Sequence, residues 1–132
     1  MKWSIKNCIP LITVLLASCS GSPKADTTSQ KGALIFPKGQ KIINEKFTGV
    51  AYLQPLVEAD SLNANSVVNV TFETGARSNW HIHPTGQILL VTGGVGYYQE
   101  KGLPKRILHK GDVIKCPPKV PHWHGASKDS AF

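Results

Sequence analysis

Short β-prone runs separated by glycine and proline constrain the fold of this chain more than any other feature. Beyond residue 33, no stretch has the 3.6-residue apolar period of an amphipathic helix. The β-prone runs are 47–57, 66–74, 87–94, 95–99, 105–109 and 112–116. The spacers between them, such as "ETGARS", "KGLP" and "PPKVP", carry the glycines and prolines of turns. Many short strands at close spacing predict an all-β sandwich or a small barrel.

Two of the runs indicate which strand faces are buried. The alternation in "VVNVTFE" places Val68, Val70 and Phe72 on one face, which predicts a strand with one buried face. "ILLV" is apolar throughout, and we expect it to be covered on both sides. The 132 residues leave room for one domain, and there is no sign of a repeat or a second domain. We therefore expect a single β domain over residues 34–132.

The first 33 residues differ in kind from the rest. "MKWSIKN" is basic, "CIPLITVLLAS" is apolar but too short to cross a bilayer, and the stretch after it is small and polar. This order is typical of a secretory signal. Leu16-Ala17-Ser18-Cys19 resembles the lipobox of bacterial lipoproteins, in which the cysteine is lipidated and becomes the first mature residue. The alternative is an ordinary signal peptide with a cysteine nearby.

The lipoprotein interpretation predicts a signal peptide over residues 1–18 and a flexible tether over 19–33 that begins at lipidated Cys19. The protein would then be anchored to a membrane of the bacterial cell envelope, at the periplasmic face or the cell surface. Cys8 would leave with the signal, so no disulfide could form within the mature chain. We expect Cys116 to be a small packed side chain and not a reactive thiol, because nothing near it in sequence suggests an activated thiol.

The charge distribution argues against nucleic acid as a partner. The net charge is +7 at pH 7, yet the lysines and arginines are scattered among turns and strand ends. There is no long basic run and no interleaving of basic with aromatic residues. A solvated surface that faces an anionic membrane accounts for these charges.

The segment "HIHPTGQ" holds three side chains that can bind a metal. On a strand, His81 and His83 project from the same face, roughly 7 Å apart at their roots, so both imidazoles can converge on one ion. Gln87 can bring a carbonyl oxygen to the same point. "PHWHG" offers His122 and His124 as further candidates. The alternative is a polar loop that happens to contain histidine.

The same residues resemble the first sequence motif of the cupin superfamily. Gly75, five residues, His81-X-His83, three residues, Gln87, six residues and Gly94 match the spacing of that motif throughout. Gln87 stands where Glu is more usual.

A second stretch resembles the second cupin motif. Gly111, five residues, Pro117-X-Lys119, two residues and His122 follow its spacing. Gly is usual in the family where Lys119 stands, and Asn is usual where Ala126 stands. The two motifs together extend the resemblance over most of the chain beyond the tether.

The resemblance implies a small antiparallel β-barrel of the jelly-roll type, often dimeric, with one divalent metal inside. It implies His81, His83, Gln87 and His122 as the metal ligands. The chain resembles small single-domain cupins related to carboxymuconolactone decarboxylase-associated proteins and manganese-dependent hydroxynitrile lyases. That similarity favours Mn or Fe, a small-molecule substrate and a homodimer. Judged by ligand type alone, Zn, Ni or Co would also fit.

Glutamine in the ligand set has a physical consequence. Three neutral imidazoles and a neutral amide leave a divalent ion with its full +2 charge, whereas a Glu would cancel one unit. Such a site is expected to be a stronger Lewis acid and to attract anionic or deprotonating ligands.

His124 follows His122 by two positions, so we expect it to face the same cavity. Two roles remain open: a catalytic residue that moves protons near the metal, or a hydrogen-bonded barrel histidine that supports a ligand. The resembling lyases continue for another strand or two that supplies a catalytic histidine, whereas this sequence ends at Phe132. We expect a barrel that lacks its last strand or is completed by a partner chain.

Three functions remain open on the sequence. The first is a divalent-metal-dependent enzyme of lyase or decarboxylase type, acting on a small polar substrate. The second is a non-catalytic cupin that binds a metal or a small ligand. The third is a metal-free barrel with relic histidines, which the complete ligand spacing disfavours.

Overall fold

The computed structural model describes residues 34–132, and every regular element in that range is a β-strand. The strands are β1 Gln40–Lys41, β2 Phe47–Thr48, β3 Ala51–Val57, β4 Val67–Phe72, β5 Arg77–Ser78, β6 Gln87–Leu90, β7 Val95–Glu100, β8 Arg106–His109, β9 Val113–Cys116 and β10 His122–Ala126. Within this range no helix could span a membrane. The predicted signal peptide, Cys19 and the tether lie outside the described residues.

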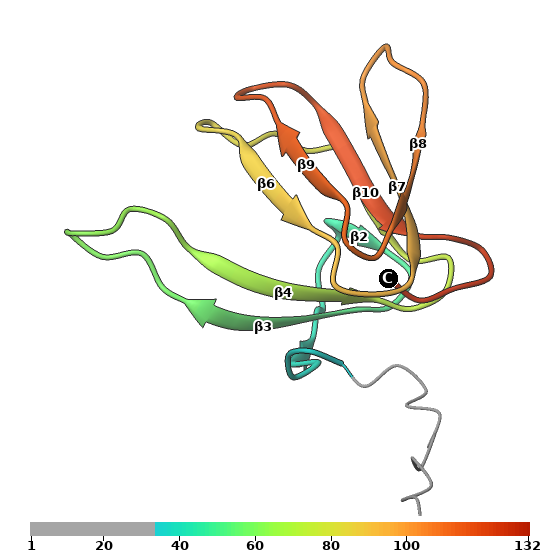
Figure 1. The fold of residues 1–132 in the computed structure, drawn as a ribbon, viewed down its shortest axis with the longest axis horizontal. Coiled ribbons are helices and arrows are strands. Elements are labelled where there is room, and N and C mark those ends of the chain that lie inside the picture. Colours follow the sequence, from blue (N-terminus) through green and yellow to red (C-terminus); the bar gives the residue numbers. More distant parts are fainter. Residues whose placement is uncertain (1–33) are drawn as a thin grey trace, which may run out of the picture.

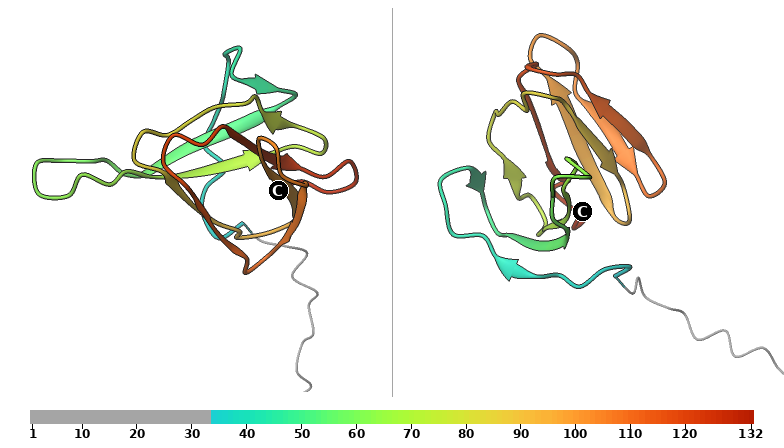
Figure 2. Two further views of the ribbon diagram at one scale, coloured as in Figure 1. Left: turned by 90° about the horizontal axis from the view of Figure 1, so that it is seen from above. Right: turned by 90° about the vertical axis from the view of Figure 1, so that its left-hand side faces the viewer.

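The strands form three antiparallel sheets, in the orders β1-β3-β4, β2-β5-β10-β7-β8 and β6-β9. In Figure 1 the β3–β4 hairpin runs beneath the other strands and projects to the left, while β6 to β10 stand above it. The two further views in Figure 2 show the strands curling around one interior. The predicted small antiparallel all-β barrel is confirmed.

The long run predicted at 47–57 is divided into β2 and β3. Gly49, between them, adopts a φ of 82°, a conformation that L side chains rarely take. A Cβ at this position would also lie 2.9 Å from the Cβ of Ala76. The turn therefore needs glycine, and it sends the two halves of the run into different sheets.

β10 lies inside the five-stranded sheet, between β5 and β7. All five of its residues are buried, and Gly125 allows β5 to come close: a Cβ there would lie 2.4 Å from the Cα of Arg77. The chain thus carries the second histidine pair into the barrel on a strand that is paired on both edges.

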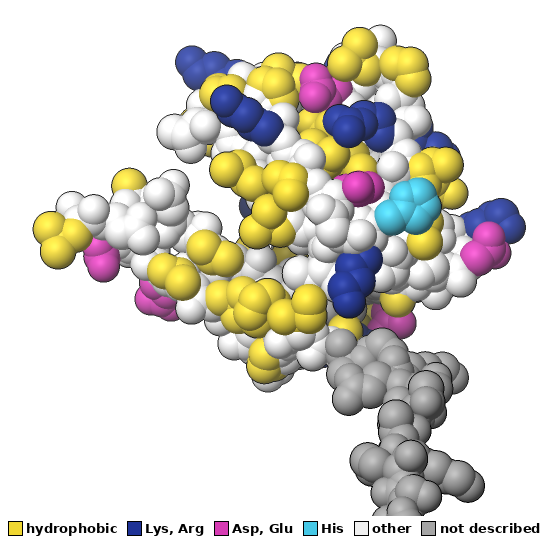
Figure 3. All heavy atoms as spheres, viewed as in Figure 1, with side chains coloured by type: hydrophobic (Ala, Val, Ile, Leu, Met, Phe, Trp, Pro, Cys, Tyr) yellow, Lys and Arg dark blue, Asp and Glu magenta, His cyan; other side chains and the backbone are white. Residues whose placement is uncertain are grey.

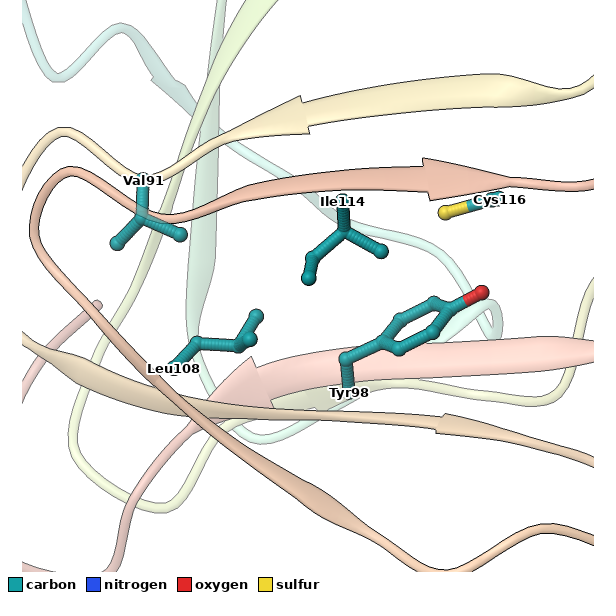
Figure 4. Packing of buried hydrophobic residues seen from close by; sticks show 5 residues of the cluster. All are labelled: Val91, Tyr98, Leu108, Ile114 and Cys116. Carbon is teal, nitrogen blue, oxygen red and sulfur yellow. The ribbon is translucent and has the colours of Figure 1, made fainter.

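Two clusters of buried residues form the core. The first contains Val91, Tyr98, Leu108, Ile114 and Cys116, which point toward one another from facing strands and from the end of β6 (Figure 4). The second contains Ala51, Phe72, Ala76 and Ala126, and Phe132 packs against both clusters. Cys116 is 1% exposed, as expected for a packing residue. Phe132 is also fixed through its backbone, because it exchanges hydrogen bonds of 2.7 and 3.0 Å with Phe72.

The expectation that "ILLV" is covered on both sides is wrong. Val91 is buried, but Ile88 and Leu90 are 68% and 66% exposed. Among the strands of residues 34–132, their strand β6 pairs with β9 alone, where Val113 is also exposed, so this small sheet has an apolar outer face that these residues leave uncovered. Figure 3 shows how many hydrophobic side chains lie on the surface of this protein. An apolar run alone does not establish burial.

Candidate metal centre

The candidate site occupies a cavity of about 670 Å³ within the barrel. His81, His83, Gln87 and His124 line one part of it, as the sequence predicted. The lining also includes the apolar side chains of Phe47, Leu53, Val68 and Val70, which we call the apolar wall. The cavity therefore combines a compact polar group with a hydrophobic surface, as small-molecule sites commonly do.

The apolar wall comes from the strand whose alternation was predicted. Phe72 is buried and Val70 packs against the same cluster, but Val68 is 45% exposed. β4 extends beyond the barrel into the projecting hairpin, so the outer end of its inward face is open to the cavity instead of being packed (Figure 1).

His81, His83 and His122 form a group able to bind a metal ion. One ring nitrogen from each lies within 4.8 Å of the other two. The ring centroids of His81 and His122 are 4.5 Å apart, and those of His81 and His83 are 5.2 Å apart. No Asp, Glu or Cys of residues 34–132 belongs to this group. The structure therefore brings together the three histidines that the two motifs predicted.

The backbone fixes the positions of these histidines. His81 and His122 form a bridge between two segments, with backbone hydrogen bonds of 3.0 Å in each direction. The carbonyl oxygen of His83 accepts hydrogen bonds from the backbone N–H groups of Lys119, at 2.9 Å, and Gly86, at 3.2 Å. Lys119 has a φ of 62°, which explains why Gly is usual at this place in the motif.

Hydrogen bonds determine which ring nitrogen His81 and His122 offer to a metal. The Nδ1 atom of His81 lies 2.8 Å from the carbonyl oxygen of Asn79, and that of His122 lies 2.9 Å from the carbonyl oxygen of Val120. A carbonyl oxygen can only accept, so both Nδ1 atoms carry the proton. In the neutral rings Nε2 then holds a free lone pair, as a metal ligand requires.

Gln87 completes a donor set that fits a divalent metal. Its Oε1 lies 3.2 Å from Nε2 of His122. With the proton on Nδ1, the Nε2 of His122 turns a lone pair toward the Gln87 amide, which can offer it either the oxygen or, after a half-turn of the amide, an N–H donor. In the orientation present here, the ring nitrogen and the amide oxygen both offer lone pairs. A cation between them would bind both, since two adjacent ligands at about 2.1 Å from one ion lie about 3 Å apart.

Burial favours the neutral form of two of these histidines. It lowers the pKa of His81 and of His83, and the neighbouring imidazoles lower both further. Metal binding needs unprotonated imidazole, so the lowered pKa values favour the ligand form of His81 and His83.

His124 faces the cavity, as expected, but is not part of the metal-binding group. It is 7% exposed, and its ring meets Phe72 edge-on at a centroid distance of 5.5 Å. Burial, together with His81, His122 and His83, lowers its pKa to about 3. Its backbone N–H donates to Oγ of Ser78 at 3.1 Å. His124 is thus a neutral imidazole beside the cluster, its centroid 5.5 Å from that of His81.

The sequence did not single out several residues of this site. Ser78 and Asn79 support the histidines from the end of β5, and Glu45 and Lys46 line the cavity near them. Asn79 could have been suspected from the sequence, because it stands two residues before His81. The other residues come near the site through the pairing of β2 with β5, which the sequence did not predict.

Comparisons with known proteins agree with this geometry. A family model for the cupin domain matches residues 68–132. The crystal structure of a cupin-like protein from Thermotoga maritima is 51% identical, with a TM-score of 0.70, and the match covers 74% of each chain. An (R)-mandelonitrile lyase from Granulicella tundricola is 44% identical over 86 residues, which are 65% of this chain and 66% of the length of that relative. The fold, the motif histidines and these similarities lead to one conclusion: the chain belongs to the cupin family.

Proposed function

We propose that this protein is a divalent-metal-dependent cupin enzyme of the lyase type, acting on a small molecule with an oxygen-bearing head and an apolar body. His81, His83, Gln87 and His122 hold the metal in this proposal. The observation that carries it is the group of three histidines whose ring nitrogens lie within 4.8 Å of one another, with the Gln87 amide 3.2 Å from Nε2 of His122. Mn and Fe are the favoured ions, and Zn, Ni or Co would also suit the ligands.

The bound ion would supply a Lewis acid with an undiminished +2 charge, because all four ligands are neutral. The chain's own residues would bind and orient the substrate. Leu53, Val68 and Val70 would hold the apolar body against the wall of the cavity and exclude water from it. This division of the cavity suits a hydroxynitrile with an aromatic ring, the kind of molecule named in the lyase from Granulicella tundricola.

His124 is the proposed proton carrier. Its imidazole is neutral at pH 7 because its pKa is about 3, so it has a lone pair free for the proton of a substrate hydroxyl. At that pKa it is a weak base, and the bound ion would be needed to make the hydroxyl more acidic. In the cleavage of a hydroxynitrile, that proton would pass to the departing cyanide as the carbon–carbon bond breaks, and an aldehyde would remain. The strongly lowered pKa favours release of the proton again, so the imidazole would return to its neutral form.

The test is an assay of (R)-mandelonitrile cleavage, with the release of benzaldehyde followed by absorbance. The full chain is stripped with a chelator and then reconstituted with Mn²⁺ or Fe²⁺. We expect turnover only after reconstitution, and a loss of about 10²–10⁴-fold in His124→Ala with the metal content unchanged. A protein that retains its metal without any turnover would support the alternative, a non-catalytic cupin.

We also propose attachment to the cell envelope through lipidated Cys19. The order of the basic, apolar and small residues around "LASC" supports this. The full chain should partition into detergent on phase separation of a cell lysate, and Cys19→Ala should shift it to the aqueous phase. Equal partitioning of the two proteins would overturn the proposal.

A homodimer is the assembly we propose. The outer face of β6 and β9, with Ile88, Leu90 and Val113 between 62% and 68% exposed, supports it as an apolar surface available to a second copy. Light scattering after gel filtration should give twice the chain mass. A monomer at micromolar concentration would contradict this assembly.

A further inference from the structure

Asn79 uses every one of its polar groups. Its side-chain Nδ2 donates to the carbonyl oxygen of Glu45 at 2.6 Å, and its Oδ1 accepts from the hydroxyl of Thr48 at 3.0 Å. Its backbone N–H donates to the carbonyl oxygen of Lys46 at 2.8 Å. Its own carbonyl oxygen accepts from Nδ1 of His81 at 2.8 Å. One residue therefore connects the segment 45–48 with a histidine of the metal-binding group.

The segment joined to Asn79 is held at its C-terminal end. Among the described strands the two-residue β2 pairs with β5, through Phe47↔Ser78 and Thr48↔Arg77, and Phe47 packs against the core cluster of Phe72. Glu45 and Lys46 precede this ladder and line the cavity. The hydrogen bonds of Asn79 to Glu45 and Lys46 extend the contact beyond the end of the ladder.

The same bonds restrain the Asn79 carbonyl group. With the side chain held at both ends and the N–H held by Lys46, the residue has little freedom to rotate its carbonyl away from His81. That carbonyl fixes the proton on Nδ1 of His81 and sets the direction of its ring. Outer partners of this kind affect metal affinity by about 10–100-fold.

We propose that Asn79 is a positioning residue of the metal centre, which clamps the cavity segment 45–48 and thereby holds the carbonyl group that orients His81. The inference rests on the proposed metal site. Asn79 is not one of the proposed ligands, and the inference gives it an indirect effect on metal affinity.

The side-chain hydrogen bonds of Asn79 to Glu45 and Thr48 predict how strongly different variants lose metal affinity. Thr48→Val removes one hydrogen bond and leaves the donation to Glu45. Asn79→Ala removes both side-chain bonds. Asn79→Asp keeps the acceptor for Thr48 but sets a carboxylate oxygen against the Glu45 carbonyl oxygen, where the amide donor now stands. The loss of affinity should increase in the order Thr48→Val, Asn79→Ala, Asn79→Asp.

The experiment is a titration of the full chain with Co²⁺ against a competing chromophoric chelator, with the visible spectrum of bound Co²⁺ recorded in parallel. We expect Asn79→Ala to weaken Co²⁺ binding by about 10–100-fold and to change the spectrum. Thr48→Val should weaken binding severalfold, and it decides the question if Asn79→Ala does not fold. Asn69→Ala is the matched control: Asn69 also donates a side-chain bond to a remote carbonyl, that of Pro37, but does not contact His81.

Unchanged affinity in both Thr48→Val and Asn79→Ala would overturn the inference, as would an equal loss in Asn69→Ala. If the unmodified chain binds no Co²⁺ at all, the proposed metal site itself fails. That outcome is distinguishable, because it appears before any variant is compared.

Discussion

His81 and His122 each donate a backbone hydrogen bond to the carbonyl oxygen of the other, at 3.0 Å in both directions. This bridge joins the two motif segments through their main chains, outside the regular ladders of the sheets. The positions of both histidines are therefore set before their side chains bind anything. Substitution of either imidazole should remove a ligand while the segments stay joined.

The charge of the ligand set can be tested at Gln87. Gln87→Glu should raise the affinity for Mn²⁺ by at least about tenfold, or about 1.4 kcal/mol, because a carboxylate cancels one unit of the ion's charge. Turnover should fall, since the ion becomes a weaker Lewis acid. Chelator competition measures the affinity, with Gln87→Met as the variant that loses the oxygen and should bind more weakly. Equal affinity in all three proteins would show that residue 87 is not a ligand.

The stability of the metal-free protein should fall in weak acid. Burial lowers the pKa of His124 to about 3, whereas an unfolded histidine titrates near 6.5. Between these values the unfolded chain binds a proton that the folded chain does not, so stability is lost as the pH falls through about 6.5. His124 alone should cost about 2 kcal/mol at pH 5 relative to pH 7. The lowered pKa values of His81 and His83 act in the same direction.

Urea unfolding at pH 7 and pH 5 measures this loss. His124→Gln should remove a large part of the difference between the two pH values. His109→Gln, at an exposed histidine, serves as the control and should leave the difference unchanged. A pH dependence that is identical in His124→Gln and the unmodified protein would contradict the assignment to His124.

Lys119 offers a stabilising substitution next to the site. Its φ of 62° costs a residue with a side chain roughly 1–2 kcal/mol, whereas glycine adopts it freely. Lys119→Gly should therefore raise the free energy of unfolding by about 1 kcal/mol, while the bond from its N–H to the His83 carbonyl is kept. Lys119→Ala changes the side chain but not the strain, and should give no such gain. Thermal unfolding of the metal-free proteins would distinguish the two.

The close approach of β10 and β5 predicts a steric defect. Gly125→Ala would place a Cβ 2.4 Å from the Cα of Arg77, so the strands must separate. We expect a loss of about 2 kcal/mol in unfolding free energy. Gly93→Ala is the matched control, because nothing lies within 4 Å of its Cβ position and its φ is not positive. Equal stability of the two variants would mean that β10 and β5 do not pack this closely.

The sequence predicted the β class from local patterns, and the resemblance of its two motifs to those of the cupin superfamily predicted that His81, His83, Gln87 and His122 lie together. It failed at Ile88 and Leu90, since apolar character does not say how many faces of a strand are covered. The apolar wall was predicted in part. The alternation placed Val68 and Val70 on one face of their strand, but it did not predict that this face lines the cavity. The link from Asn79 to Glu45 could not be predicted, because it exists only once β2 has paired with β5.

The most direct test of the metal centre is elemental analysis of the full chain purified without chelator, beside His81→Ala. We predict about one transition metal ion per chain in the unmodified protein and none in the variant, with both proteins folded by circular dichroism. Metal retained by folded His81→Ala, or absent from both proteins, would contradict the proposed site.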